Sequence, residues 1–215
     1  MGIKLLDPMN LRDIKSAVHL HSTLIPKSPV VLLGSTFTEK FYYSKLVQHR
    51  LLYCDLYEFN GQMVGFIAYT KNPNFLKLGF QRYFLSLAYF LTPLFIQNPF
   101  RVFQLFRASQ LNKGLKPTNC QEGFILSFGV LPEYRNHRFI RKTGLRISHE
   151  LFKRAAQFFR EHDVAIIKML VEPHNKEALL FYHSFSCSFE NITVLRKKLI
   201  KVTYKVGSIL DYATR

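Results

Sequence analysis

Acidic residues are scarce in this sequence of 215 residues, and their scarcity restricts the partners that it can attract. Asp and Glu number 14 against 30 Lys and Arg, which gives a net charge of +16. Between Glu58 and Glu122 there is no acidic residue at all. A chain this basic is expected to meet an anion. Nucleic acid, acidic phospholipid and phosphorylated small molecules all meet that requirement.

Cysteine is also rare, and its pattern excludes two kinds of structure. Cys54, Cys120 and Cys187 are odd in number, far apart and without the spacing of zinc ligands. A disulfide framework and a metal site are therefore not expected, and reduced cytosol is the simplest compartment. His19 and His21 lie two positions apart and do not share a helical face. They suggest local capping or a substrate contact rather than a joint metal site.

Charge is missing from 83 to 100, a run of eighteen residues. Two prolines in its second half argue against a membrane-spanning helix, which would leave polar backbone groups unpaired in lipid. We therefore expect two helices, 81–92 and 99–110, within an insertion at about 75–115. Their aromatic load and flanking cations are typical of helices in a membrane interface. Packing within the chain, or on a second copy in a homodimer, is the open alternative.

The remaining periodicity predicts an α/β chain in one domain, residues 1–215. Helical spacing covers 8–24, and a second helix runs from about 35 to 46. Runs of β-forming residues at 51–59 and 62–69 flank Asn60-Gly61, a strong hairpin signal because both turn positions need positive φ. Further along, the patterns predict a buried central strand, a helix at about 145–160, a strand at 164–171, a helix at 175–184 that Asn175 caps, and strands at 189–199 and 200–206.

A cationic segment follows the central strand, which breaks at Pro132. Helical periodicity begins again near Leu145. Four cations lie between these points: Arg135, Arg138, Arg141 and Lys142. A helix start offers unpaired N–H groups and the positive end of the helix dipole, so the segment predicts a site for phosphate or diphosphate. A solvated basic loop is the alternative.

Two motifs follow each other at a characteristic spacing in the C-terminal half. They are Val130-x-Pro132-x-x-Arg135 and, after a strand that ends at Val171, Asn175-x-x-Ala178-x-x-Phe181-Tyr182. Over residues 123–189 this succession resembles the GNAT superfamily of acyl-CoA N-acyltransferases. The resemblance implies an α/β (α+β) fold with a mixed, mostly antiparallel sheet, a splayed central strand and flanking helices. It also implies acetyl-CoA or another acyl-CoA as co-substrate, and no metal.

The resemblance assigns roles to individual residues. The strand backbone that would pair with the pantetheine arm of the cofactor belongs to Phe128, Gly129 and Val130. Asn175 would lie close to the pantetheine, and Tyr182 would be the general acid that protonates the departing thiolate. An amine acceptor also needs a base, for which Glu122 at the start of the central strand is our candidate. The alternatives are a core aromatic for Tyr182 and a solvated strand end for Glu122.

The expected diphosphate loop departs from the family pattern, which places glycine where the backbone closes on the phosphates. Counting forward from Pro132 puts Arg138 and Ile140 at the positions of the small residues. Counting back from the following helix gives Arg141-Lys142-Thr143-Gly144, which restores the first glycine. The two counts differ by six residues. We adopt the second count, with Arg135 and Arg138 as added phosphate contacts.

The sequence therefore predicts an acyltransferase that moves an acetyl or other acyl group from acyl-CoA directly to an amine. The basic, aromatic insertion suggests an amino sugar or a lipid-linked acceptor, and a cytoplasmic protein that is peripheral to the inner face of an anionic membrane. One alternative is a basic nucleic-acid- or ribosome-associated binding protein, which is less favoured because no recognised nucleic-acid motif is present. The other is a catalytically inactive GNAT scaffold.

Overall fold

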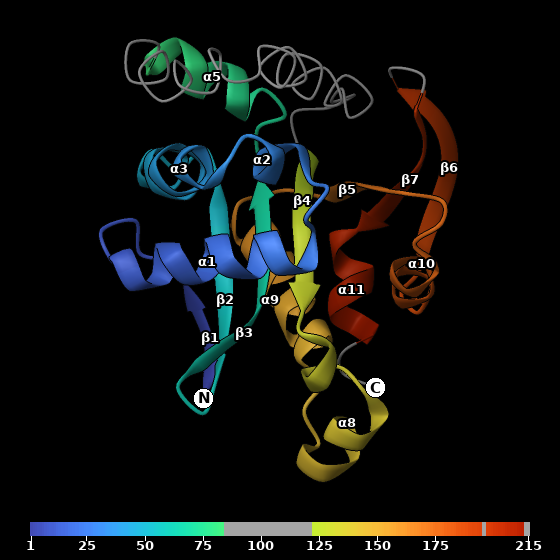
Figure 1. Cartoon of the computed structure of the whole chain (residues 1–215). Helices are drawn as coiled ribbons and strands as arrows, with labels where there is room; N and C mark the ends of the chain where they lie inside the picture. Colours follow the sequence, from blue (N-terminus) through green and yellow to red (C-terminus); the bar gives the residue numbers. More distant parts are fainter. Residues whose placement is uncertain (84–121, 195–196, 213–215) are drawn as a thin grey trace.

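The computed structural model describes residues 1–83, 122–194 and 197–212. Its strands form a seven-stranded sheet in the order β1-β2-β3-β4-β5-β7-β6 (Figure 1). The strands are β1 (Gly2–Leu5), β2 (Tyr53–Phe59), β3 (Gln62–Thr70), β4 (Glu122–Val130), β5 (Ile166–Val171), β6 (Cys187–Val194) and β7 (Lys197–Lys205). Every neighbouring pair is antiparallel except β4 and β5, which are parallel. The expected mixed, mostly antiparallel sheet is confirmed.

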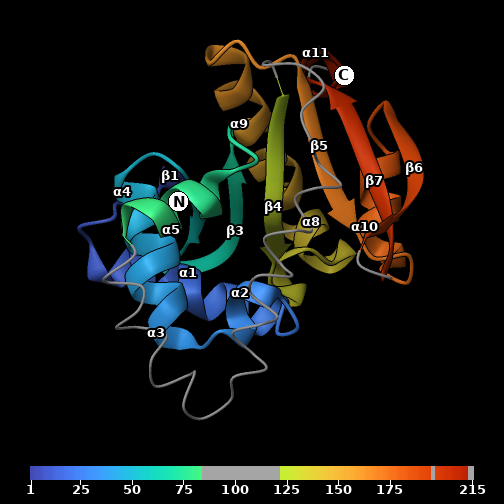
Figure 2. The same ribbon diagram turned by 90° about the horizontal axis from the view of Figure 1, so that it is seen from above.

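Helices cover both faces of this sheet. Figures 1 and 2 show α1 and α2 on one face and α9 on the other. The helical segments are α1 (Leu11–Leu24), α2 (Pro29–Leu32), α3 (Ser35–Phe37), the π-helical η1 (Thr38–Lys45), α4 (Leu46–Gln48), α5 (Phe75–Arg82), the 3₁₀ turn η3 (Pro132–Tyr134), α8 (His137–Thr143), α9 (Ile147–Glu161), α10 (Lys176–His183) and α11 (Val206–Tyr212). Each face of the sheet has its own buried apolar cluster.

Local sequence signals explain the best-predicted elements. The Asn10 side chain accepts hydrogen bonds from the backbone N–H groups of the first turn of α1, which fixes the start of that helix. Asn60 and Gly61 take φ values of 50° and 78°, so the β2–β3 hairpin turns as predicted. On the other face, α9 packs directly on β4, because a Cβ at Gly123 would lie 2.3 Å from the Phe159 ring.

The parallel strands β4 and β5 pair at one end and separate at the other, as expected for a splayed central strand. Pairing between β4 and β5 is confined to three positions, from Glu122 opposite Ile166 to Phe124 opposite Lys168. Both strands then continue, β4 to Val130, without pairing to each other. The backbone edges beyond these three positions are therefore left open to a ligand.

A β-bulge in β4 sets which side chains face each layer. Ala68 of β3 pairs with Ser127 and the next residue of β3 pairs with Ile125, so Leu126 is the extra residue. After the bulge, Ser127 and Gly129 face α1, whose Leu24 would lie 2.9 Å from a Cβ at Gly129.

Several boundaries differ from the sequence-based expectation. Helix α5 begins at Phe75 and ends at Arg82, and most of the helix expected at 81–92 lies outside the described residues. The final strands were divided wrongly, because β6 ends at Val194 and β7 already begins at Lys197. The short elements β1, α8 and α11 were not predicted. The expected helix at 99–110 and its membrane contact lie outside the described residues.

Within the described ranges, no helix combines the length and apolar character needed to cross a bilayer.

Candidate active site

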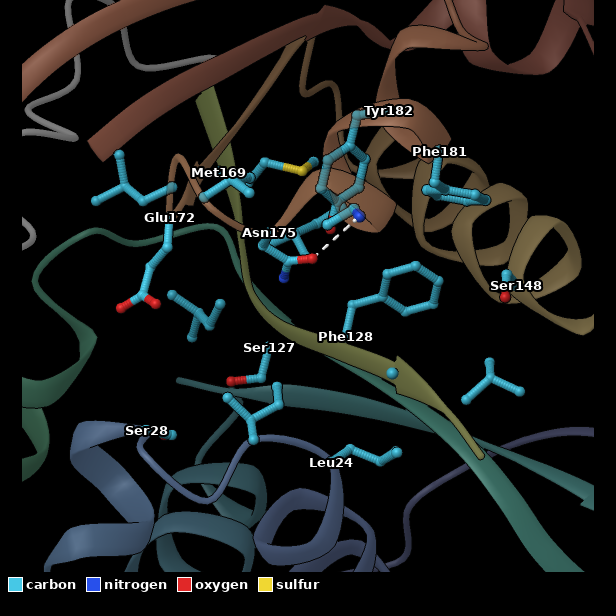
Figure 3. Close-up of a pocket in the computed structure, with 18 of the residues that line it drawn as sticks. Leu24, Ser28, Ser127, Phe128, Ser148, Met169, Glu172, Asn175, Phe181 and Tyr182 are labelled. Atoms are coloured by element: carbon cyan, nitrogen blue, oxygen red, sulfur yellow. Dashed lines mark hydrogen bonds between the residues drawn. The ribbon is translucent and has the colours of Figure 1, made fainter. Parts of the chain in front are cut away.

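A cavity of about 750 Å³ occupies the space where β4 and β5 separate. Its walls come from β4, the end of β5, α10, the start of α9 and the segment that follows α1. Figure 3 shows Tyr182 between Met169 and Phe181, across the cavity from Leu24 and Ser28. The cavity therefore joins the open cleft to the α1 face of the sheet.

Asn175 begins the helix that carries the predicted acid. Its side-chain oxygen accepts a hydrogen bond from the backbone N–H of Ala178 at 3.1 Å, which caps α10 (Figure 3). The cap directs Phe181 and Tyr182 toward the cavity, and both residues line it. The sequence prediction of Asn175 as a helix cap is confirmed, while its contact with a cofactor stays a prediction.

Tyr182 is buried but borders the cavity. The Tyr204 hydroxyl donates a hydrogen bond of 2.8 Å to the Tyr182 carbonyl and so fixes the backbone at this point. In the described part of the chain, the Tyr182 hydroxyl itself makes no hydrogen bond. Burial raises the pKa of Tyr182, so the hydroxyl stays protonated at neutral pH. The side chain can therefore act as a proton donor.

The connection between β4 and α9 contains an extra helix. This helix explains why the forward count from Pro132 and the backward count from the following helix differ by six residues. Helix α8 occupies His137–Thr143, and Gly144 ends it in the left-handed region with φ of 73°. Helix α9 then begins at Ile147. The signal for α8 was present in the sequence, because Asn136 accepts a hydrogen bond from the Phe139 N–H at 2.8 Å as an N-cap.

The structure divides the predicted phosphate contacts into two groups. Arg135 lines the cavity and forms an ion pair of 2.7 Å with Glu177 of α10. The others lie on α8 or at its end and do not line the cavity: Arg138, Arg141, Lys142, Thr143 and Gly144. Arg146 and Ser148 at the start of α9 line the cavity and were not singled out from the sequence. Together with the helix N-terminus, they offer positive charge and hydrogen-bond donors to an anion.

The pantetheine residues predicted on β4 all line the cavity: Phe128, Gly129 and Val130. They lie beyond the three positions where β4 pairs with β5. Their backbone on the β5 side is therefore open to hydrogen bonding with a ligand.

Glu122 does not lie where the sequence suggested. It is buried, 2% exposed, at the closed end of the strand pair, and Lys168 Nζ donates to its carboxylate at 2.6 Å. Neither residue lines the cavity. The alternative of a solvated strand end is wrong, because the register of β4 and β5 brings Lys168 beside Glu122.

A different carboxylate lines the cavity. Glu172 follows β5 and accepts a hydrogen bond from Lys197, and His174 Nε2 lies 2.9 Å from its carboxylate. The hydrogen bond from Lys197, together with the nearby positive charges, lowers the pKa of Glu172, so the carboxylate is ionised at neutral pH. It can attract a cationic amine. Its position next to Pro173 in the sequence gave no sign of this location.

The described residues contain no group of three His, Cys, Asp or Glu side chains that could hold a metal ion. The residues that line the cavity provide a tyrosine hydroxyl, two carboxylates, arginine side chains near a helix start and an open strand edge.

The one parallel strand pair, which opens into a cleft, agrees with the splayed central strand that the resemblance to the GNAT superfamily implies. No family model matches the sequence, and no curated protein sequence matches it either. Among solved structures, an aminoglycoside 6′-acetyltransferase type Ii aligns with 96% of this chain and 97% of its own, at 9% identity and a TM-score of 0.59.

Two further solved structures were determined with coenzyme A. Aminoglycoside acetyltransferase AAC(6′)-Ib, in complex with coenzyme A and kanamycin, is 10% identical over 96% of each chain, with a TM-score of 0.56. PaiA N-acetyltransferase from Thermoplasma acidophilum, in complex with coenzyme A, is 12% identical over 95% of this chain and 99% of that one, with a TM-score of 0.51. The chain therefore has the GNAT fold.

Proposed function

We propose that the protein transfers an acyl group from acyl-CoA, with acetyl-CoA as the expected donor, to the amine of a small acceptor. The observation that carries this proposal is the open β4–β5 cleft, which brings an unpaired strand edge, a tyrosine hydroxyl and an anion site into one cavity. The strand edge at Phe128–Val130 would pair with the pantetheine amides. The start of α9, with Arg146 and Arg135, would hold the diphosphate.

The proposed reaction needs two proton transfers. The acceptor nitrogen attacks the thioester carbonyl, so that a C–N bond forms and the C–S bond breaks. The sulfur leaves as a thiolate and takes the proton of Tyr182. The proton of the amine must go to a base, and the geometry supports Glu172 over Glu122 for this role, because Glu172 lines the cavity and Glu122 does not. Glu172 also supplies the negative charge that would draw an ammonium group in.

We propose an amino sugar or a related amine that carries oxygen atoms as the acceptor. The ionised Glu172 and two serine hydroxyls, of Ser28 and Ser127, line the part of the cavity next to α1 and β4. Because two structurally similar enzymes are named for aminoglycoside acetylation, kanamycin is a suitable first probe.

The experiment compares wild type with Tyr182→Phe. Acetyl-CoA should bind both proteins with the same affinity in a calorimetric titration. Release of free CoA thiol in the presence of kanamycin should be about 100-fold slower in the variant, because the proton donor is lost. Tyr134→Phe is the matched control, since Tyr134 also lines the cavity but its hydroxyl donates to Gln62, at 3.3 Å. Failure of wild type to bind acetyl-CoA would rule out the proposed function.

A further inference from the structure

His21 is a fully buried histidine that connects α1 to three other parts of the fold. Its Nδ1 lies 2.8 Å from the Tyr43 hydroxyl. Its Nε2 lies 3.0 Å from Ser28 Oγ, in the segment after α1, and 3.3 Å from Ser127 Oγ, on β4. Since both serines line the cavity, the imidazole stands directly behind the cavity wall.

The surroundings of His21 determine which nitrogen carries the proton. Burial lowers the pKa of His21 to about 4, so the ring is neutral at pH 7 and has a single N–H. Burial raises the pKa of Tyr43, so its hydroxyl stays protonated. Among the described residues, the hydrogen-bond partner of that hydroxyl is His21 Nδ1. Tyr43 therefore donates to Nδ1, and the ring proton lies on Nε2.

This tautomer orients the two serines. The Nε2–H donates toward Ser28 Oγ and Ser127 Oγ, so each serine oxygen acts as an acceptor on its buried side. Neither hydroxyl has another hydrogen-bond partner in the described part of the chain. Each hydroxyl proton is therefore left to point into the cavity, where an oxygen atom of a ligand could accept from it.

The wall around the two serines is otherwise mostly apolar. The residues that share this side of the cavity include Leu24, Val30, Leu33, Phe37 and Leu126. Two adjacent donors in an apolar wall suit one oxygen atom of a ligand better than a charged group. Ser127 also precedes Phe128, whose backbone lies where the acyl-CoA arm is proposed to run. An oxygen bound by the serines would therefore lie on the side of the cavity where the acyl-CoA arm is proposed to run.

We propose that Ser28 and Ser127 recognise a hydroxyl or carbonyl oxygen on the carbon next to the acceptor amine, and that His21 positions their hydroxyls for this contact. The inference rests on the proposed acyl transfer and narrows its acceptor to 1,2-amino alcohols and α-amino carbonyl compounds. His21 is a positioning residue, because it acts on the acceptor through the two serines.

The test uses two amines that differ by one hydroxyl group, trans-2-aminocyclohexanol and cyclohexylamine, with acetyl-CoA as donor. Wild type should prefer the amino alcohol by about 10-fold or more in kcat/KM, since a site built to pair with an oxygen discriminates against its absence. The double variant Ser28→Ala/Ser127→Ala should reduce this preference to less than about 2-fold. Ser22→Ala, which removes an α1 serine bonded to the His19 carbonyl, is the control and should keep the preference.

Two further measurements separate positioning from a structural role. His21→Gln should lower the preference in wild type but have no further effect in the double serine variant, whereas a structural role would lower it in both. Long-range ¹H–¹⁵N correlation spectra at pH 7 should show His21 protonated at Nε2. A ring protonated at Nδ1 would overturn the inference, because the serines would then donate to His21.

The outcomes also distinguish this inference from the proposed function. Equal rates with the two amines would overturn oxygen recognition and leave acyl transfer intact. No transfer to any amine, kanamycin included, would overturn the proposed function and this inference with it.

Discussion

The β4–β5 pair is closed at one end, where the two strands pair, and open at the other, where they separate around the cavity. At the closed end, backbone hydrogen bonds join the strands over three positions, and Lys168 and Glu122 pair at 2.6 Å with both side chains buried. At the open end, the strands separate around the cavity, and Tyr182 borders it without a hydrogen bond from its hydroxyl to any described residue.

The difference shows how one short region of pairing can create a site. A sheet that paired along its full length would satisfy the backbone of Phe128–Val130 internally and leave no edge for a ligand. The closed end holds the strands together, and the bulge at Leu126 then turns Ser127 toward α1. Polar groups that pair with each other, as at the closed end, stabilise the fold. Polar groups that face the cavity can instead contact a ligand.

The largest expected effect comes from breaking the closed end. Lys168→Met should lower the free energy of unfolding by about 3–5 kcal/mol, because it removes the cation that pairs with the buried Glu122 carboxylate. Urea unfolding at pH 7 measures this change.

The control for this prediction lies at the open end. Lys197→Met removes a cation from Glu172, but the Lys197 side chain is 55% exposed, so the loss should not exceed about 1 kcal/mol. Similar losses in the two variants would mean that the closed end does not depend on its ion pair.

Lowering the pH should destabilise the protein through the neutral His21 beside the open end. The folded-state pKa of His21 is about 4, against 6.5 for an unperturbed histidine. Between these values the unfolded chain binds the proton and the folded chain does not. The contribution of neutral His21 to the free energy of unfolding is therefore complete above pH 6.5. It falls by about 3 kcal/mol as the pH drops to 4.

The measurement is the difference in unfolding free energy between wild type and His21→Gln at several pH values. Taking the difference is necessary because burial raises the pKa of Asp55 to about 6, and this group gives a slope of the opposite sign in both proteins. The difference should shrink or reverse as the pH falls from 6.5 to 4. A difference that is constant over this range would show that His21 is not held neutral.

Sequence patterns predicted those parts of the fold whose signals are local. The Asn60-Gly61 turn and the Asn175 cap depend on residues within a few positions of one another. The Glu122–Lys168 pair spans 46 positions and the Ser127–His21 contact spans 106, so neither leaves a local signal. Both depend on the β4 register and bulge, which tertiary packing determines. The structure accordingly places Asn175 and Tyr182 on the cavity, whereas Arg135 is the one predicted phosphate contact that lines it.

The smallest expected effect concerns the anion site of the open end. Arg146→Ala should weaken acetyl-CoA binding by about 10-fold, because Arg146 lines the cavity at the start of α9. Arg138→Ala is matched in chemistry and lies on α8 outside the cavity lining, so it should change the affinity by less than about 2-fold. Calorimetric titrations at two salt concentrations measure both. If Arg138 were the more important of the two, the diphosphate would bind over α8, the forward count from Pro132 would be correct, and the open end of the cleft would extend further than the cavity described above.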